Sequence, residues 1–96
     1  MIGIDTTAKM ILDHYGQQKQ ELQAVHELSE LILLLAARPD QRKADYKKNV
    51  TTEIADSLVM IEQIRIANEI TDKDVHAVVA EKLSRQLGRI QKEAET

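Results

Sequence analysis

Two pairs of acidic side chains carry the strongest chemical signal in the sequence. The first pair is Glu27 and Glu30, and the second pair is Glu53 and Asp56. The members of each pair are three positions apart, so a helix would place both carboxylates on one side. Both pairs lie in apolar sequence, where an ionised carboxylate is costly unless a cation compensates it. The spacing therefore predicts a cation site built from four carboxylates.

The position numbers of the two pairs fit a helical hairpin. When a short connection joins two antiparallel helices, the position numbers of opposed residues have a constant sum. Glu27 with Asp56 and Glu30 with Glu53 give the same sum, so the four carboxylates would meet at one level. Ligation by oxygen alone favours Mg²⁺ or Mn²⁺, and Mg²⁺ usually completes its coordination with waters and substrate phosphates. We therefore expect a phosphorylated ligand; solvated surface acids are the alternative.

The elements that must position these residues are predicted to be helices, because no stretch shows strand-type alternation. Proline at position 39 ends one helical segment, and residues 41–48 are polar and predicted to form a connection. Four helices are predicted. The first is capped by Asp5, Thr6 or Thr7 and ends before Gly16, and the second runs from Gln17 to Ala37. The third runs from a cap at Asn49 or Thr51 to Asn68, and the fourth opens with a cap at Thr71 and ends at Glu93. The predicted fold is all-α: an antiparallel bundle of three long helices and a short N-terminal one, forming a single domain over residues 1–96.

Composition sets further bounds on the protein. Hydrophobic residues make up 43% of the chain but aromatic residues only 2%. The core therefore contains few bulky side chains, which favours its completion by oligomerisation. The third helix is apolar around most of its circumference, which predicts burial on several sides. The fourth helix carries a stripe predicted to face inward, formed by Val75, Val79, Leu83, Leu87 and Ile90.

Charge and hydropathy exclude several classes of protein. A net charge of −3 argues against a general nucleic-acid binder, which needs a basic face. The longest apolar run, residues 31–37, is too short to span a bilayer, and the N-terminus shows no signal peptide. The chain has no cysteine, which excludes disulfides and thiolate zinc sites. We expect a cytoplasmic protein that binds neither membranes nor nucleic acid.

Cations and histidines complete the set of candidate residues. Lys82, Arg85 and Arg89 lie beside the apolar stripe of the fourth helix, where they could neutralise a polyphosphate; a solvated basic face is the alternative. His14, His26 and His76 have no metal-ligand spacing, although His26 precedes Glu27 and so could touch the edge of the site.

The ordered motifs resemble those of a known family. They are Tyr15-Gly16-x-x-x-Gln20, Glu27-x-x-Glu30, Glu53-x-x-Asp56 and Lys82. Together they resemble the MazG-like all-α nucleoside triphosphate pyrophosphohydrolases, whose signature is EExxE, a variable spacer and ExxD. The resemblance covers residues 8–92.

The resemblance implies an activity and a role for each motif. Four acids, here Glu27, Glu30, Glu53 and Asp56, would bind the Mg²⁺ that holds the triphosphate, and water would attack the α-phosphorus to give a nucleoside monophosphate and pyrophosphate. Lys82 would contact phosphate, with Arg85 and Arg89 as further candidates, and Gln20 would line the nucleotide pocket. The protein would be a homodimer or dimer-based tetramer that removes non-standard nucleotides.

One position departs from the family signature. The first glutamate of EExxE is His26 in this chain. Two alternatives to an active enzyme therefore stay open: a catalytically weakened relative that binds nucleotide or metal, and a non-enzymatic helical interaction module. The sequence does not select the base or the sugar of the substrate.

Overall fold

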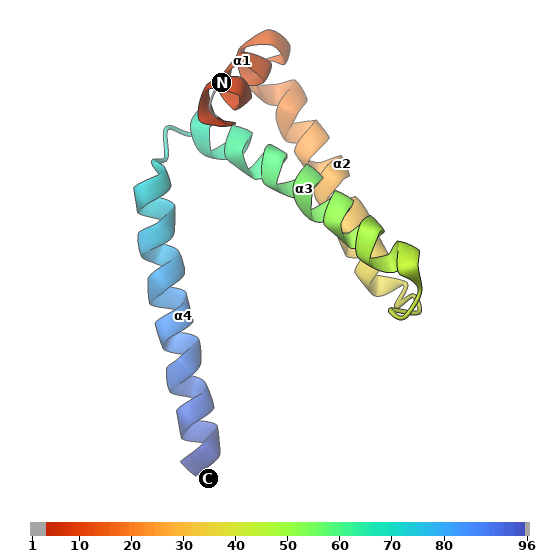
Figure 1. The fold of residues 1–96 in the computed structure, drawn as a ribbon. Helices are drawn as coiled ribbons and strands as arrows, with labels where there is room; N and C mark the ends of the chain where they lie inside the picture. The colour runs from red at the N-terminus through yellow and green to blue at the C-terminus, as the bar shows by residue number, and fades with distance from the viewer. Residues whose placement is uncertain (1–3, 96) are drawn as a thin grey trace.

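The computed structural model describes residues 4–95, and within that range every regular element is an α-helix. The elements are α1 (Ile4–Tyr15), α2 (Gln17–Ala36), α3 (Ala44–Ala67) and α4 (Asp72–Glu95), arranged as shown in Figure 1. The prediction of an all-α chain with one short and three long helices is confirmed. Residues 1–3 lie outside the described range, and Ile4 is already helical.

The α2–α3 hairpin is the body of the fold. The two helices run antiparallel and pack side by side, joined by the short connection 37–43 (Figure 1). Ala24 on α2 and Met60 on α3 are buried. At one end of the hairpin the Gln20 amide donates a buried hydrogen bond to the Gln63 carbonyl oxygen over 2.8 Å. The positions of these glutamines have the same sum as those of the opposed acids, so this bond supports the predicted register.

Helix α1 covers one end of the hairpin. It packs mainly on α3 and buries Ala8 and Leu12. Gly16 separates α1 from α2 with a φ of 89° and a ψ of 154°, a conformation that is essentially restricted to glycine. The predicted break at Gly16 is therefore confirmed, and it is the reason that α1 can fold back on the hairpin.

Two predicted helix starts are wrong. Helix α1 begins at Ile4, so that Asp5, Thr6 and Thr7 lie inside its first turns instead of capping it. Helix α3 begins at Ala44, which shortens the predicted connection 41–48 and places Asn49 and Thr51 within the helix. The Thr51 hydroxyl donates to the carbonyl of Lys47, one turn earlier, over 2.7 Å. A threonine hydroxyl that bonds in this way is compatible with a helix interior.

Helix α4 leaves the body of the molecule. The Thr71 side chain caps it by accepting a hydrogen bond from the Asp74 amide over 3.1 Å, as predicted. None of its residues is buried, and beyond its start it diverges from the other helices in the described part of the chain (Figure 1). The predicted inward stripe is therefore wrong for a single chain, and its members are exposed: Val75, Val79, Leu83, Leu87 and Ile90.

The outer side of α3 is also uncovered. Ile54, Leu58 and Ile61 follow one another at i, i+4 and i+7 and are between 43% and 56% exposed. The prediction that α3 is buried on several sides is consequently wrong for one chain, because α4 does not fold back along it. A buried guanidinium shapes the turn between these helices, since Arg65 donates to the Ile70 carbonyl over 2.9 Å.

Candidate metal centre

The four acids of the two predicted pairs lie on the facing helices of the hairpin. Glu27 and Glu30 come from α2, Glu53 and Asp56 come from α3, and all four are half-buried. One carboxylate oxygen from each of Glu27, Glu53 and Asp56 lies within 4.8 Å of the other two. The antiparallel register brings them together, because it places Glu27 of α2 opposite Asp56 of α3 and Glu30 opposite Glu53. Oxygens at this separation can share one divalent cation.

Glu53 is the most confined member of the cluster. Its Oε2 atom is buried and has no hydrogen-bond partner among the described residues. Burial raises the pKa of Glu53 above its ordinary value, and the negative charges of Glu30, Asp56 and Glu27 raise it further. An unpartnered buried oxygen that faces three other carboxylates would be stabilised by a cation, and the all-oxygen donor set fits Mg²⁺ or Mn²⁺.

Both acids of α2 are held by a side chain one turn earlier. The Gln23 amide donates to Glu27 over 2.9 Å, and His26 Nε2 lies 3.0 Å from a carboxylate oxygen of Glu30. His26, Glu27 and Glu30 also form a group whose possible ligand atoms lie within 4.8 Å of one another. The position of His26 next to Glu27 predicts a place at the edge of the site, whereas its contact with Glu30 was not predicted. The i,i+4 spacing of both pairs was the signal that could have revealed these contacts.

The predicted substrate contacts are not assembled around these acids within one chain. Lys82, Arg85 and Arg89 are exposed on α4, away from the hairpin. Arg85 instead pairs with Glu81 on its own helix over 3.1 Å. Gln20 is buried and bonded to Gln63, and it lines a narrow crevice beside α1.

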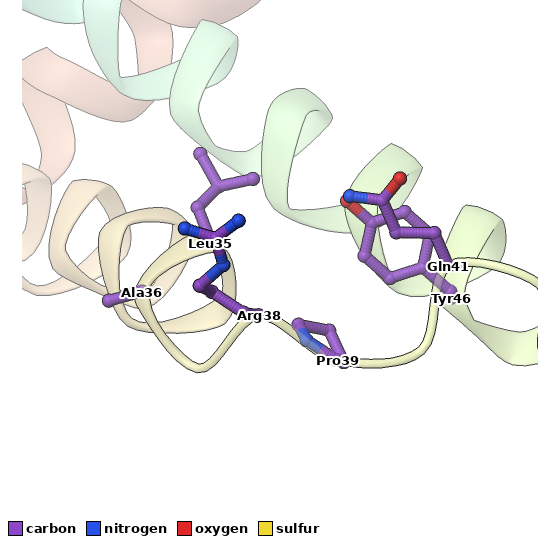
Figure 2. A pocket seen from close by; sticks show the side chains of 6 residues that line it. All are labelled: Leu35, Ala36, Arg38, Pro39, Gln41 and Tyr46. Atoms are coloured by element: carbon purple, nitrogen blue, oxygen red, sulfur yellow. The ribbon is translucent and has the colours of Figure 1, made fainter.

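Several hollows border the hairpin, one of them at the acids and another at the α2–α3 connection. A small one of about 160 Å³ adjoins the acids and is lined by Gln23, Glu27, Asp56, Val59 and Met60. A larger, open one of about 520 Å³ lies at the α2–α3 connection (Figure 2). Figure 2 shows Leu35 and Arg38 on its α2 side, and Gln41 and Tyr46 on its α3 side. This second hollow was not predicted, because the geometry of the loop creates it.

No family model, curated protein or solved structure matches the chain. Among the described helices, none is long and apolar enough to cross a membrane.

Proposed function

We propose that the chain is a Mg²⁺-dependent nucleotide pyrophosphohydrolase that converts a (d)NTP and water into a (d)NMP and pyrophosphate. The observation that carries this proposal is the half-buried cluster of Glu27, Glu30, Glu53 and Asp56, in which Glu53 has a buried oxygen without a partner. The MazG-like resemblance of the motifs supports the same activity. Removal of non-standard nucleotides is the corresponding cellular role.

The four carboxylates would hold one or two divalent ions. When bound, Mg²⁺ supplies charge neutralisation at the phosphate oxygens and lowers the pKa of coordinated water. Gln23 and His26 fix the rotamers of Glu27 and Glu30, so these oxygens need little reorganisation on binding. A carboxylate of the cluster can also accept a proton from the attacking water.

The basic residues supply the second requirement of phosphoanhydride hydrolysis, which is neutralisation of charge that develops on the leaving pyrophosphate. Lys82 is the first candidate, with Arg85 and Arg89 beside it on α4. Gln20 stays a candidate substrate contact, although using its amide would require its bond to Gln63 to open. The enzyme would act as a homodimer or dimer-based tetramer.

Turnover is tested by incubating the protein with a panel of (d)NTPs and Mg²⁺ and by identifying the products. We expect a nucleoside monophosphate and pyrophosphate in equal amounts, with activity lost on chelation and restored by Mg²⁺. Release of inorganic phosphate, or no reaction with any nucleotide, would contradict the proposal.

Metal binding is tested separately by thermal unfolding. Mg²⁺ binds the assembled cluster and not the unfolded chain, so a hundredfold excess over Kd should stabilise the fold by about 2 to 3 kcal/mol. An unchanged unfolding midpoint would show that the acids are merely solvated.

The contact between His26 and Glu30 favours one alternative, a relative that binds nucleotide without turnover. A histidine at this position cannot act as a carboxylate ligand, and it engages a neighbouring acid. Calorimetry distinguishes this alternative from the enzyme, because the nucleotide would then bind in the presence of Mg²⁺ yet be recovered intact after incubation.

A further inference from the structure

Helix α2 places a histidine beside two acids of the cluster. His26, Glu27 and Glu30 each offer one possible ligand atom, and these three atoms lie within 4.8 Å of one another. This group differs in kind from that of Glu27, Glu53 and Asp56, because one of its three donors is an imidazole nitrogen. Glu27 belongs to both groups, so the two sets of donors adjoin each other. The hairpin therefore presents an all-oxygen set and a mixed set of nitrogen and oxygen donors side by side.

The contact between His26 and Glu30 has the dimensions of a chelating pair. Imidazole and carboxylate ligands bind divalent ions at about 2.1 Å, so two such ligands at a right angle lie about 3.0 Å apart. The distance between His26 Nε2 and Glu30 Oε1 is 3.0 Å. The two residues have i,i+4 spacing, at which helical side chains share one face and at which two histidines of a helix hold zinc in other proteins. An ion bound between these two atoms therefore requires no movement of the helix.

A second histidine–acid pair of the same spacing shows what a simple surface pair looks like in this chain. His76 Nδ1 lies 3.5 Å from a carboxylate oxygen of Asp72 on α4, also at i,i+4. Within residues 4–95, His76 belongs to no group of three converging donors. The pair on α2 differs, because Glu30 also interacts with Glu53, whose Oε2 atom is buried without a hydrogen-bond partner among the described residues. The pair on α2 is thus part of a converging cluster, and the pair on α4 is not.

The mixed set selects a different ion from the all-oxygen set. Imidazole nitrogen favours first-row transition ions such as Fe²⁺, Co²⁺ and Zn²⁺, whereas Mg²⁺ prefers oxygen ligands. The Gln23 amide donates a hydrogen bond to Glu27 and so orients the third donor. The side chains of His26 and Glu30 are 62% and 40% exposed. An ion held by these donors would therefore keep coordination positions open to water and to a phosphate oxygen.

We propose that His26, Glu27 and Glu30 form a second divalent-ion site, selective for a first-row transition ion such as Co²⁺ or Zn²⁺, beside the Mg²⁺ site of Glu27, Glu53 and Asp56. The chain then binds two unlike ions that share the Glu27 carboxylate. The inference rests on the metal centre of the proposed function but not on turnover of a nucleotide. It also gives a role to the histidine that stands where the family signature has its first glutamate, since the exchange replaces an oxygen donor by a nitrogen donor.

Calorimetric titration with Co²⁺ in excess Mg²⁺ tests the second site, because Mg²⁺ then occupies the all-oxygen set. The unaltered protein should bind one Co²⁺ per chain. His26→Gln removes the imidazole nitrogen and should weaken Co²⁺ binding at least about tenfold, the lower end of the loss that follows even when a residue that only orients a ligand is removed. The matched control, His76→Gln, should leave Co²⁺ binding unchanged. Absence of Co²⁺ binding to the unaltered protein would overturn the proposal, as would equal Co²⁺ affinities of the unaltered protein and His26→Gln.

The identity of the donor is tested by exchanging nitrogen for oxygen at the same position. His26→Glu keeps three possible ligands but makes all of them carboxylates. The ratio of Co²⁺ affinity to Mg²⁺ affinity at the second site should therefore fall about tenfold or more, while two divalent ions still bind per chain. Because the His26 side chain is exposed, neither substitution should disturb folding. An unchanged affinity ratio would show that the nitrogen does not bind the ion.

Nitrogen NMR of the histidine rings tests the same contact in the unaltered protein, where no variant can misfold. Zn²⁺ is diamagnetic and shifts the signal of a ring nitrogen that binds it. With Mg²⁺ in excess, one equivalent of Zn²⁺ should shift the His26 Nε2 signal and leave those of His14 and His76 in place. No shift at His26, or equal shifts at all three histidines, would contradict the site.

These outcomes separate the second site from the proposed function. A protein that hydrolyses nucleotides with Mg²⁺ but shows no shift at His26 would lack the second site and keep the proposed function. A protein that hydrolyses no nucleotide yet binds Zn²⁺ through His26 would lose the proposed function and keep the second site.

Discussion

The α2–α3 hairpin and helix α4 are both built of long α-helices, but their side chains have different surroundings. In the hairpin, polar side chains face the partner helix, as with the buried Gln20–Gln63 bond and the acidic cluster. In α4, polar and apolar side chains alike are exposed. The polar residues of the hairpin thus indicate how α2 and α3 align, because each of them interacts with a specific residue on the facing helix. The α4 stripe consists of aliphatic side chains that would fit many surfaces, so it indicates a face but not a partner.

The largest expected effect separates an acid of the cluster from an exposed acid on the same hairpin. Glu53→Gln removes one negative charge from the cluster while keeping the side-chain shape, and should lower kcat by about 10²-fold or more, as loss of one electrostatic group in an active site does. Glu21→Gln, a matched change at an exposed position of α2, should leave kcat near that of the unaltered protein. Steady-state kinetics with Mg²⁺ and the preferred nucleotide would measure both. Equal rates for the two variants would show that the cluster takes no part in the reaction.

The second prediction concerns the buried bond that fixes the hairpin register. Gln63→Leu leaves the Gln20 amide buried without a partner and should reduce the free energy of unfolding by about 1 to 3 kcal/mol. Adding Gln20→Leu removes the unpaired group, so the double variant should recover part of that loss. Urea denaturation of the two single variants and of the double variant provides the measurement. A double variant that loses the sum of the two single effects would mean that the glutamines do not act as a pair.

Much of the hairpin was predictable from the sequence, because its helices are long and its acids pair by position number. Gly16 and Thr71 also indicated their boundaries correctly, since each acts through local geometry. The start of α3 was not predictable in this way. Asn49 and Thr51 are good caps in isolation, but the packing of α3 against α2 stabilises an additional turn and a half before them.

The position of α4 depended on contacts that sequence patterns do not reveal. Its stripe and its cap were predicted, yet its direction is set by buried Arg65, which links Asp5, Glu62 and the Ile70 carbonyl. That network joins three separate segments, so no local spacing announces it. The contact between His26 and Glu30 is different, because its i,i+4 spacing is visible in the sequence, but its place at the site depends on Glu30 facing α3.

A smaller effect follows from the raised pKa of Glu53. Folding favours the protonated form of this group, so its contribution to stability is complete below the ordinary pKa of 4.5 and is lost as pH rises through the raised value. Glu53→Gln does not titrate. The stability of the metal-free variant relative to the unaltered protein should therefore increase as pH rises from below 4.5 toward neutrality. Urea denaturation at several pH values with a chelator tests this, and a constant difference would show that Glu53 is not perturbed in solution.

The smallest predicted effect asks whether α4 and the hairpin unfold together. Gly88 lies inside α4, and a Cβ added there would meet no other atom within 4 Å. Gly88→Ala should stabilise the helix by about 0.5 to 1 kcal/mol. Both tyrosines, Tyr15 and Tyr46, lie outside α4, so their fluorescence reports unfolding of the remaining helices alone. If α4 packs on another surface, Gly88→Ala should raise the urea midpoint seen by tyrosine fluorescence, because the hairpin and α4 then unfold as one unit. If α4 is an independent arm, the gain would be confined to the circular dichroism of α4 and the tyrosine midpoint would not move.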